Sequence, residues 1–271
     1  MTGRLSTASE MARHDSLVDL WPLLLSELIG TAVLVGVGLS VVILIFGDGS
    51  LVAQAIPSLT ARRVLSGALF GGVGGLIAVS PVGVISGAHI NPAVTLGFWL
   101  MGKLRTRVAL GYLAAQSVGA VVGAVPLLAW GEMGRSVAFG ATGPGPGYST
   151  AAALAGEIGA TFGLVCTLCV FLGVRELRRF TPAAMPVLFA FLVPLEASLS
   201  GTSVNPVRTL GPAVISGYWE AAWIYWLGPA LGAIAATAVC SFLASRIEVA
   251  KLYYFDRDRG GLFHLMSRGT K

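Results

Sequence analysis

The sequence is short of charge. Its 18 Lys and Arg and 13 Asp and Glu make up 11% of 271 residues, against about 25% in an average globular domain. A soluble protein needs charge to cover its surface, so this shortage excludes an ordinary soluble domain. Hydrophobic residues make up 55% of the chain, the mean hydropathy is +0.80, and the apolar residues fall in long blocks. The composition therefore predicts a membrane protein.

Residues that build redox and metal sites are also scarce. The three cysteines, Cys166, Cys169 and Cys240, all lie inside apolar blocks, which excludes a disulfide framework and a zinc-binding pattern. Cys166 and Cys169 have the spacing of a redox pair, and the alternative is that they are two small helix residues. No nucleophile–base pair or phosphate-binding glycine loop lies outside the apolar blocks. We therefore expect no enzyme activity, no cofactor and no metal.

The basic residues sit in short clusters at the ends of apolar segments, so the net charge of +5 does not indicate a nucleic-acid partner. The first 20 residues include Glu10, Asp15 and Asp19 and no apolar core, which is unlike a signal peptide. We expect a polar tail over residues 1–20.

Six stretches approach the length of about 20 apolar residues that a spanning helix needs. They are residues 21–46, 64–84, 108–130, 151–174, 182–199 and 221–245. Three of them carry one charge each, at Glu27, Glu157 and Glu196. Backbone polar groups cannot be left unpaired in lipid, so these segments are expected to be helices. The fold class is an all-α membrane protein.

The distribution of Lys and Arg indicates the orientation. With both termini in the cytoplasm, 14 of the 18 basic residues lie on the inner side; the other four are Arg62, Arg63, Arg135 and Arg208. We therefore expect both termini to be cytoplasmic, in a plasma membrane or a bacterial inner membrane.

The chain repeats itself. Residues 86–97 (SGAHINPAVTLG) and 200–211 (SGTSVNPVRTLG) agree at seven of twelve positions, 114 residues apart. The helices that open the two halves also share a Glu, at positions 27 and 157. Each half then has three helices, an odd number, so the second half crosses the membrane in the opposite sense. The repeats cover about residues 21–130 and 150–245 and form an inverted pair.

Each Asn-Pro precedes a short apolar run, at residues 93–101 and 207–216. Such a run is too short to span and suggests a re-entrant segment. Asn is a good N-cap and Pro is favoured at the first helical position. Two half-helices from opposite faces would meet with their positive N-termini near the midplane. Irregular backbone at that depth is tolerated where it lines a water-filled path, so the sequence predicts a pore.

The chain resembles the aquaporin family, also called the major intrinsic proteins. The resemblance rests on two Asn-Pro motifs in register with an inverted six-helix pattern, and on the Arg three residues after the second Asn. The resemblance covers about residues 20–245, a channel domain over residues 21–245 between the N-terminal tail and a cytoplasmic tail over residues 246–271. It implies a homotetramer in a lipid bilayer, in which each subunit conducts water and small uncharged solutes such as glycerol or urea. It also implies that ions and protons are excluded.

By the resemblance, Asn91 and Asn205 point their amides into the pore, and Pro92 and Pro206 stack the half-helices together. Arg208 becomes the cationic wall of the narrowest constriction; the alternative is a salt bridge to Glu196 without a filter role.

The resemblance also gives Glu27 and Glu157 a supporting role, in which they accept N–H groups of the re-entrant loops; the alternative is an ion-binding or proton-relay role. His89 looks like the loop histidine of the family, where a structural and a gating role are both open.

The chain departs from the family pattern at the second motif and in the filter. Val207 stands where the family has Ala, so we expect different local packing and an intact channel. Val193 stands where strict water channels place His, and either Gly71 or Phe70 fills the position on the second helix. Thr202 takes the remaining filter position.

We expect a less polar, wider constriction that passes solutes such as glycerol. Thr209, where glycerol facilitators carry Asp, argues against this, and the substrate stays open.

Two features have no family role. Glu196 is interpreted either as an anchor for the loop at residues 200–204 or as a pore-lining carboxylate. The tail at residues 246–271 either lies on an anionic membrane surface or is loose.

Two other functions remain as alternatives. Inverted repeats with half-helices also build secondary transporters, and the same fold could serve a structural or adhesion role.

Overall fold

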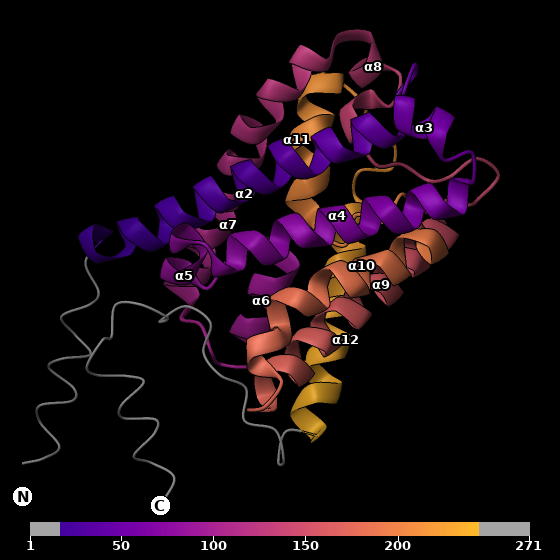
Figure 1. Ribbon diagram of the computed structural model, residues 1–271. Coiled ribbons are helices and arrows are strands. Elements are labelled where there is room, and N and C mark those ends of the chain that lie inside the picture. The colour runs from indigo at the N-terminus through magenta and orange to yellow at the C-terminus, as the bar shows by residue number, and fades with distance from the viewer. Residues whose placement is uncertain (1–16, 244–271) are drawn as a thin grey trace, which may run out of the picture.

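The computed structural model describes residues 17–243, which form helices and no strands. The elements are α2 (Leu17–Phe46), α3 (Leu51–Ala55), α4 (Leu59–Val79), α5 (Pro81–Ser86), α6 (Pro92–Leu100), α7 (Thr106–Ala124), η1 (Val125–Trp130), α8 (Gly131–Arg135), η2 (Ala138–Gly140), α9 (Thr150–Gly173), η3 (Arg178–Phe180), α10 (Thr181–Glu196), α11 (Pro206–Ser216) and α12 (Ile224–Leu243). Figure 1 shows their arrangement. The predicted tail at residues 246–271, and residues 1–16 of the N-terminal tail, lie outside the described residues.

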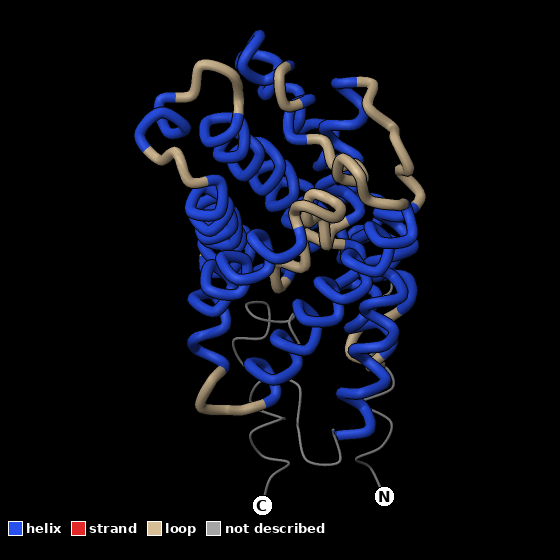
Figure 2. The backbone as a smooth tube through the Cα atoms, turned by 90° about the vertical axis from the view of Figure 1, so that its right-hand side faces the viewer, coloured by secondary structure: helices blue, strands red, loops and turns tan. Residues whose placement is uncertain are grey.

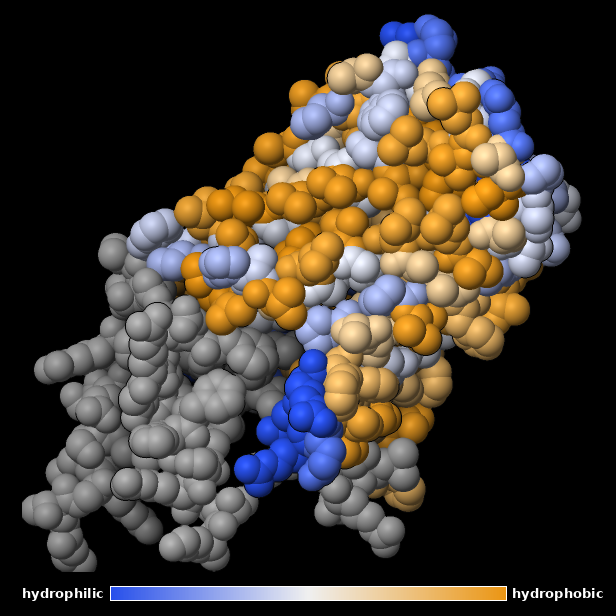
Figure 3. All heavy atoms as spheres, in the orientation of Figure 1, coloured by the Kyte–Doolittle hydropathy of each residue, from blue (hydrophilic) through white to orange (hydrophobic). Residues whose placement is uncertain are grey.

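Six helices are long and apolar enough to cross a membrane. They are α2, α4, α7 with its continuation to Arg135, α9, α10 with the preceding η3, and α12. An apolar surface covers the middle of the molecule, and hydrophilic residues gather toward its ends (Figure 3). The protein is therefore a multi-pass membrane protein, as the composition predicts.

The predicted bounds of the second span, residues 64–84, were wrong at both ends. The helix starts at Leu59, where Ser58 accepts the N–H of Ala61 at 3.2 Å, and it ends at Val79. Ser80 caps a separate short helix, and Pro81 stands in its first turn. A proline lacks the N–H that would continue the helix before it, so the apolar run is broken there.

The two halves pack as an inverted repeat. Within each half the first helix packs along the last one, α2 on α7 and α9 on α12, and α4 lies along α10 between the halves. Each short helix crosses to the other half, α6 against α12 and α11 against α7. Figure 2 shows loop segments in the centre of the bundle, surrounded by helices. The fold is thus six spanning helices plus two re-entrant half-helices.

Three glycines four residues apart form the contact between α4 and α10. Gly67, Gly71 and Gly75 lie directly against the backbone of α10, so that a Cβ on any of them would meet a carbonyl oxygen of that helix. Small residues let membrane helices approach closely. This stripe therefore brings the second span of one half onto the second span of the other.

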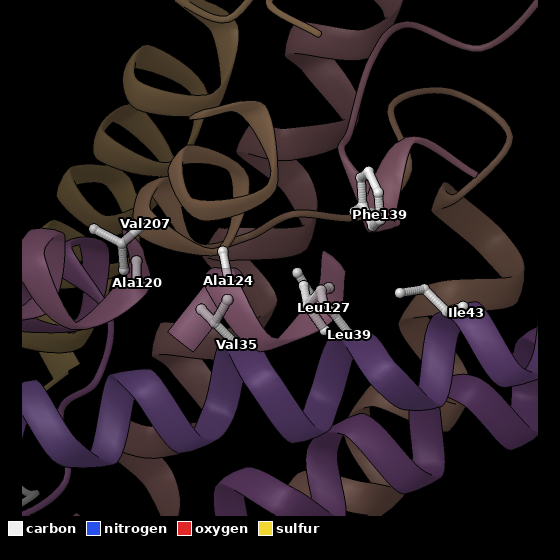
Figure 4. Close-up of a cluster of buried hydrophobic side chains, with 8 residues drawn as sticks. All are labelled: Val35, Leu39, Ile43, Ala120, Ala124, Leu127, Phe139 and Val207. Atoms are coloured by element: carbon white, nitrogen blue, oxygen red, sulfur yellow. The ribbon is translucent and has the colours of Figure 1, made fainter. Parts of the chain in front are cut away.

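Val207 is fully buried in a cluster that joins α2, α7 and α11 (Figure 4). The other members of this cluster are Val35, Leu39, Ile43, Ala120, Ala124, Leu127 and Phe139. Two small residues of α7, Ala120 and Ala124, belong to the same cluster, so Val207 packs among apolar side chains.

The cysteines pack in the same way. Cys169 and Cys240 are buried in one apolar cluster on α9 and α12, and all three thiols are free. Their surroundings match the interpretation of Cys166 and Cys169 as small helix residues.

Candidate functional site

The two Asn-Pro motifs start the two half-helices. Asn91 caps α6 with its side-chain oxygen 2.8 Å from the N–H of Ala93. Asn205 caps α11 in the same way, at 3.2 Å from the N–H of Val207. Pro92 and Pro206 are the first helical residues, where a missing N–H costs nothing.

Each asparagine also reaches across to the other half. The amide of Asn91 donates to the carbonyl oxygen of Val204 at 2.9 Å, and the amide of Asn205 donates to that of Ile90 at 2.9 Å. These reciprocal bonds hold the two helix N-termini together. A side-chain amide has two N–H donors, so each asparagine keeps one for another partner.

The loops before the asparagines are strained in the same places. The φ angles of Ala88 and Ile90 are 50° and 42°, and those of Thr202 and Val204 are 54° and 48°. A left-handed residue other than glycine costs roughly 1–2 kcal/mol. Such strain persists only where the surroundings enforce it, and it gathers at functional sites.

Glu27 holds the first loop in this conformation. Its carboxylate accepts four hydrogen bonds: from the Ser86 hydroxyl at 2.6 Å, the His89 N–H at 2.9 Å, the Ile90 N–H at 2.7 Å and the Gln116 amide at 2.7 Å. The carboxylate is completely buried, and burial of a charge requires such partners.

Glu157 holds the second loop. Its Oε1 lies 2.5 Å from the Ser200 hydroxyl and 2.7 Å from the Ser203 N–H, and its Oε2 accepts the Val204 N–H at 2.8 Å. Glu196 also contacts the Ser200 hydroxyl and is buried. A contact with Ser200 is what the interpretation of Glu196 as an anchor for the loop at residues 200–204 predicts. Glu196 is not among the residues that line the two cavities described below.

His89 is packed inside the protein. Its side chain is 2% exposed, Nδ1 lies 3.2 Å from the Thr95 hydroxyl, and the ring contacts Phe98 and Tyr112 at centroid distances of 5.1 and 5.2 Å. The ring is held by these contacts, while its Nε2 is buried without a hydrogen-bond partner.

Two cavities lie on either side of one pair of rings. The first, which we call the Asn cavity, has a volume of about 440 Å³ and is lined by Asn91 and Asn205 among others. The second, the Arg208 cavity, has a volume of about 340 Å³ and is lined by Arg208 among others. Phe70 and Phe189 line both cavities, so the two spaces adjoin at these rings.

Four expected filter residues gather in the Arg208 cavity: Phe70, Val193, Thr202 and Arg208. Gly71 does not. It lines the Asn cavity alone, and a Cβ there would lie 2.5 Å from the Met185 carbonyl oxygen. The structure thus puts Phe70, not Gly71, beside the other filter candidates.

Arg208 is buried without an ion pair to Glu196. Its Nη1 donates to the carbonyl oxygen of Gly140 at 2.7 Å, and the guanidinium carbon lies 5.9 Å from the centre of the Phe70 ring. The alternative of a salt bridge to Glu196 was therefore wrong. Gly140, with φ at 81°, was missed, because nothing in its local sequence marks a carbonyl for this contact.

Two tyrosines that sequence reasoning missed support the loops. Tyr112 donates to the carbonyl of Ser86 at 2.8 Å, and Tyr225 donates to that of Ser200 at 2.7 Å. Both are fully buried. The two tyrosines occupy similar positions in the last helices of the two halves, so aligning the repeats beyond the Asn-Pro motifs could have paired them.

Comparison with known proteins agrees with this architecture. The family model for the major intrinsic proteins matches residues 14–240. Aquaporin A of Dictyostelium discoideum is 36% identical over 222 residues, which are 79% of this chain and 75% of that protein. Aquaporin PIP2-7 of Arabidopsis thaliana is 39% identical over 183 residues, 63% of this chain and 65% of that protein.

A solved structure has the same fold. The aquaglyceroporin from Plasmodium falciparum superposes with a TM-score of 0.64 at 20% identity, over 84% of this chain and 96% of that one. At this identity the likeness concerns the fold alone. On the family match and the relatives, the chain belongs to the major intrinsic protein family, whose aquaporin members are passive channels and not enzymes.

Proposed function

We propose that this protein is a passive channel for water and small neutral solutes, with its selective constriction between Phe70, Val193, Thr202 and Arg208. The observation that carries the proposal is the pair of adjoining cavities, one lined by Asn91 and Asn205 and the other by Arg208. A path that runs from the amides past the two phenylalanines to the guanidinium offers hydrogen bonds to a neutral solute.

Exclusion of ions follows from the charges along this path. Two helix N-termini, each with roughly half a positive charge, meet at the asparagines, and Arg208 adds a full positive charge. An arginine and the positive ends of half-helices are barriers to protons and cations. The free N–H of each asparagine lets a water molecule or a hydroxyl group bind without a charge.

Val193 decides the proposed solute size. Its side chain contributes no hydrogen-bonding group to the Arg208 cavity, so the part of the wall that it forms is apolar. We propose that glycerol and urea pass as well as water, because their carbon or amide faces can pack on this wall while their polar groups face Arg208.

Stopped-flow light scattering on proteoliposomes tests the proposal, with water shrinkage compared with glycerol and urea entry. We expect both rates above those of empty liposomes. Water flux without glycerol or urea flux would contradict the wide constriction, and the protein would then be a channel for water alone. No flux of any solute would contradict the channel and favour a structural or adhesion role, whereas flux that depends on an ion gradient would favour a secondary transporter.

The orientation and assembly are also proposals. The distribution of basic residues supports cytoplasmic termini, and six spans put both ends of the described chain on one side. Thiol labelling of single cysteines introduced near each terminus, in intact cells, tests this. Large exposed apolar side chains such as Leu76 and Val187 face lipid or a second copy, and native mass spectrometry tests the homotetramer.

A further inference from the structure

The two loop supports differ at one point. In the first half, the Ser26 hydroxyl oxygen lies 2.9 Å from that of Ser86, and its single hydrogen is shared between Ser86 and the Val82 carbonyl. Ser86 in turn donates to Glu27. A neutral hydroxyl therefore stands behind the serine of the first repeated motif and completes its hydrogen bonds.

The second half lacks this hydroxyl. Gly156, which precedes Glu157 as Ser26 precedes Glu27, has no side chain, and Glu196 takes the place of Val82, 114 residues earlier. A Cβ on Gly156 would lie 2.5 Å from Oε1 of Glu196. The Glu196 carboxyl thus occupies the space of the missing side chain and contacts Ser200 in its stead.

The count of hydrogens around Ser200 decides what Glu196 does there. The Ser200 hydroxyl has one hydrogen and lies within hydrogen-bond distance of both Glu157 and Glu196. Its oxygen also accepts the Thr202 N–H at 3.3 Å. One hydroxyl hydrogen cannot serve two carboxylates, so one of the two carboxyl groups must bring a proton of its own.

The surroundings place that proton on Glu196. Glu157 accepts two backbone N–H groups, and such bonds favour the charged form of a carboxyl. Glu196 has fewer such donors, because its hydrogen-bonding neighbours are Ser200 and Thr202 and its Oε2 is buried without a hydrogen-bond partner. Two charges on one hydroxyl would repel each other in this buried site, and the nearby positive charge of Arg208 acts on Glu157 more strongly than on Glu196.

We propose that Glu196 is a positioning residue that acts as a neutral carboxylic acid, donating to Ser200 in place of the serine hydroxyl that the first half uses. Ser200 then donates to Glu157 and holds the N–H of Thr202, a residue that lines the Arg208 cavity. Glu196 thereby fixes one wall of the constriction without facing the pore. This assignment rests on the proposed channel function.

Three variants test the assignment, each measured for the ratio of glycerol to water permeability and for thermal stability in detergent. In Glu196→Gln the amide donates as the acid does, so we expect both measurements to stay near the wild type. In Glu196→Val the donor is lost, and we expect the permeability ratio to change roughly fivefold. This is the factor by which losing one hydrogen bond changes the balance between two conformations of the loop. The double variant Gly156→Ser with Glu196→Val rebuilds the arrangement of the first half and should restore the ratio.

The variants separate this proposal from its alternatives. If Glu196→Gln alters the ratio as much as Glu196→Val, Glu196 acts as an anion and the proposal is wrong. If the double variant folds to the wild-type oligomer and keeps the altered permeability ratio, a serine hydroxyl cannot replace Glu196, and the proposed equivalence of the two supports is wrong. Should the wild type conduct nothing, the channel function fails, and the melting temperatures of the same three variants still test the hydrogen bond.

Discussion

The guanidinium of Arg208 lies 5.9 Å from the centre of the Phe70 ring. This distance is within the roughly 6 Å range of a cation–π contact. The two residues come from opposite halves of the repeat, and both line the Arg208 cavity. The Arg208 cavity is therefore lined jointly by α4 and α11, and the Phe70 ring lies beside the guanidinium.

Replacing Val193 with His is expected to make the channel more selective for water. The imidazole adds bulk and a hydrogen-bonding group to the Arg208 cavity, so we expect glycerol entry to fall about tenfold or more, a change of about 1.4 kcal/mol in the barrier, while water flux changes less. Stopped-flow light scattering measures both rates. Val193→Leu adds bulk alone; equal loss of glycerol flux in the two variants would mean that size, not polarity, limits the solute.

Replacing Arg208 with Met is expected to let cations and protons leak. The variant removes the positive charge of the constriction and its bond to Gly140 and keeps an apolar stem of similar length. A pH-sensitive dye inside proteoliposomes reports the proton leak after a pH jump. Arg135→Met is the control, because Arg135 pairs with Glu132 on an exposed surface outside the cavity. A leak no larger than that of the control would show that the half-helix dipoles suffice as the barrier.

Replacing Glu27 with Gln is expected to destabilise the protein by about 2–4 kcal/mol, because the amide N–H₂ turns toward donors that need an acceptor. Four donors converge on the Glu27 carboxylate. Unfolding in detergent, followed by tryptophan fluorescence, measures the loss. Glu132→Gln, at a side chain that is 88% exposed, should stay within about 0.5 kcal/mol of the wild type. Equal melting of the two variants would rule out Glu27 as the support of the first loop.

Two glycines on α4 are expected to respond in opposite directions to alanine. A Cβ at Gly67 would fall onto the carbonyl of Phe189, whereas a Cβ at Gly72 would meet nothing within 4 Å. Gly67→Ala should push α4 away from α10 and cost about 1–3 kcal/mol. Gly72→Ala should be neutral or stabilising by up to about 1 kcal/mol, because alanine has less freedom to lose. Thermal unfolding of the two variants compares them directly, and a more stable Gly67→Ala would contradict the close helix contact.

Much of the fold could be read from the sequence because its causes are local. A span is a run of apolar residues, and a half-helix starts at an asparagine cap with a proline after it. Six spans and two half-helices could therefore be predicted from local patterns. The second span was the exception, since Ser80 and Pro81 break an apolar run that hydropathy alone treats as continuous.

The site was predictable only as far as the repeated motifs reached. Asn91, Asn205 and Arg208 stand inside or beside those motifs. The second-helix filter position was ambiguous by one residue, and one residue on a helix turns a side chain by about 100°. Only the packing of Gly71 against α10 leaves Phe70 for the cavity.

The sequence by itself determined the class of the protein, the inverted repeat and the identity of the two capping asparagines, because hydropathy, capping and internal similarity need no knowledge of distant contacts. Only the tertiary structure decided which residues meet at the constriction and which carboxyl supports which loop. Glu196 and Gly156 are 40 positions apart, and Arg208 and Gly140 are 68 apart. Contacts of this kind depend on how distant segments pack against one another, so a local sequence pattern cannot predict them.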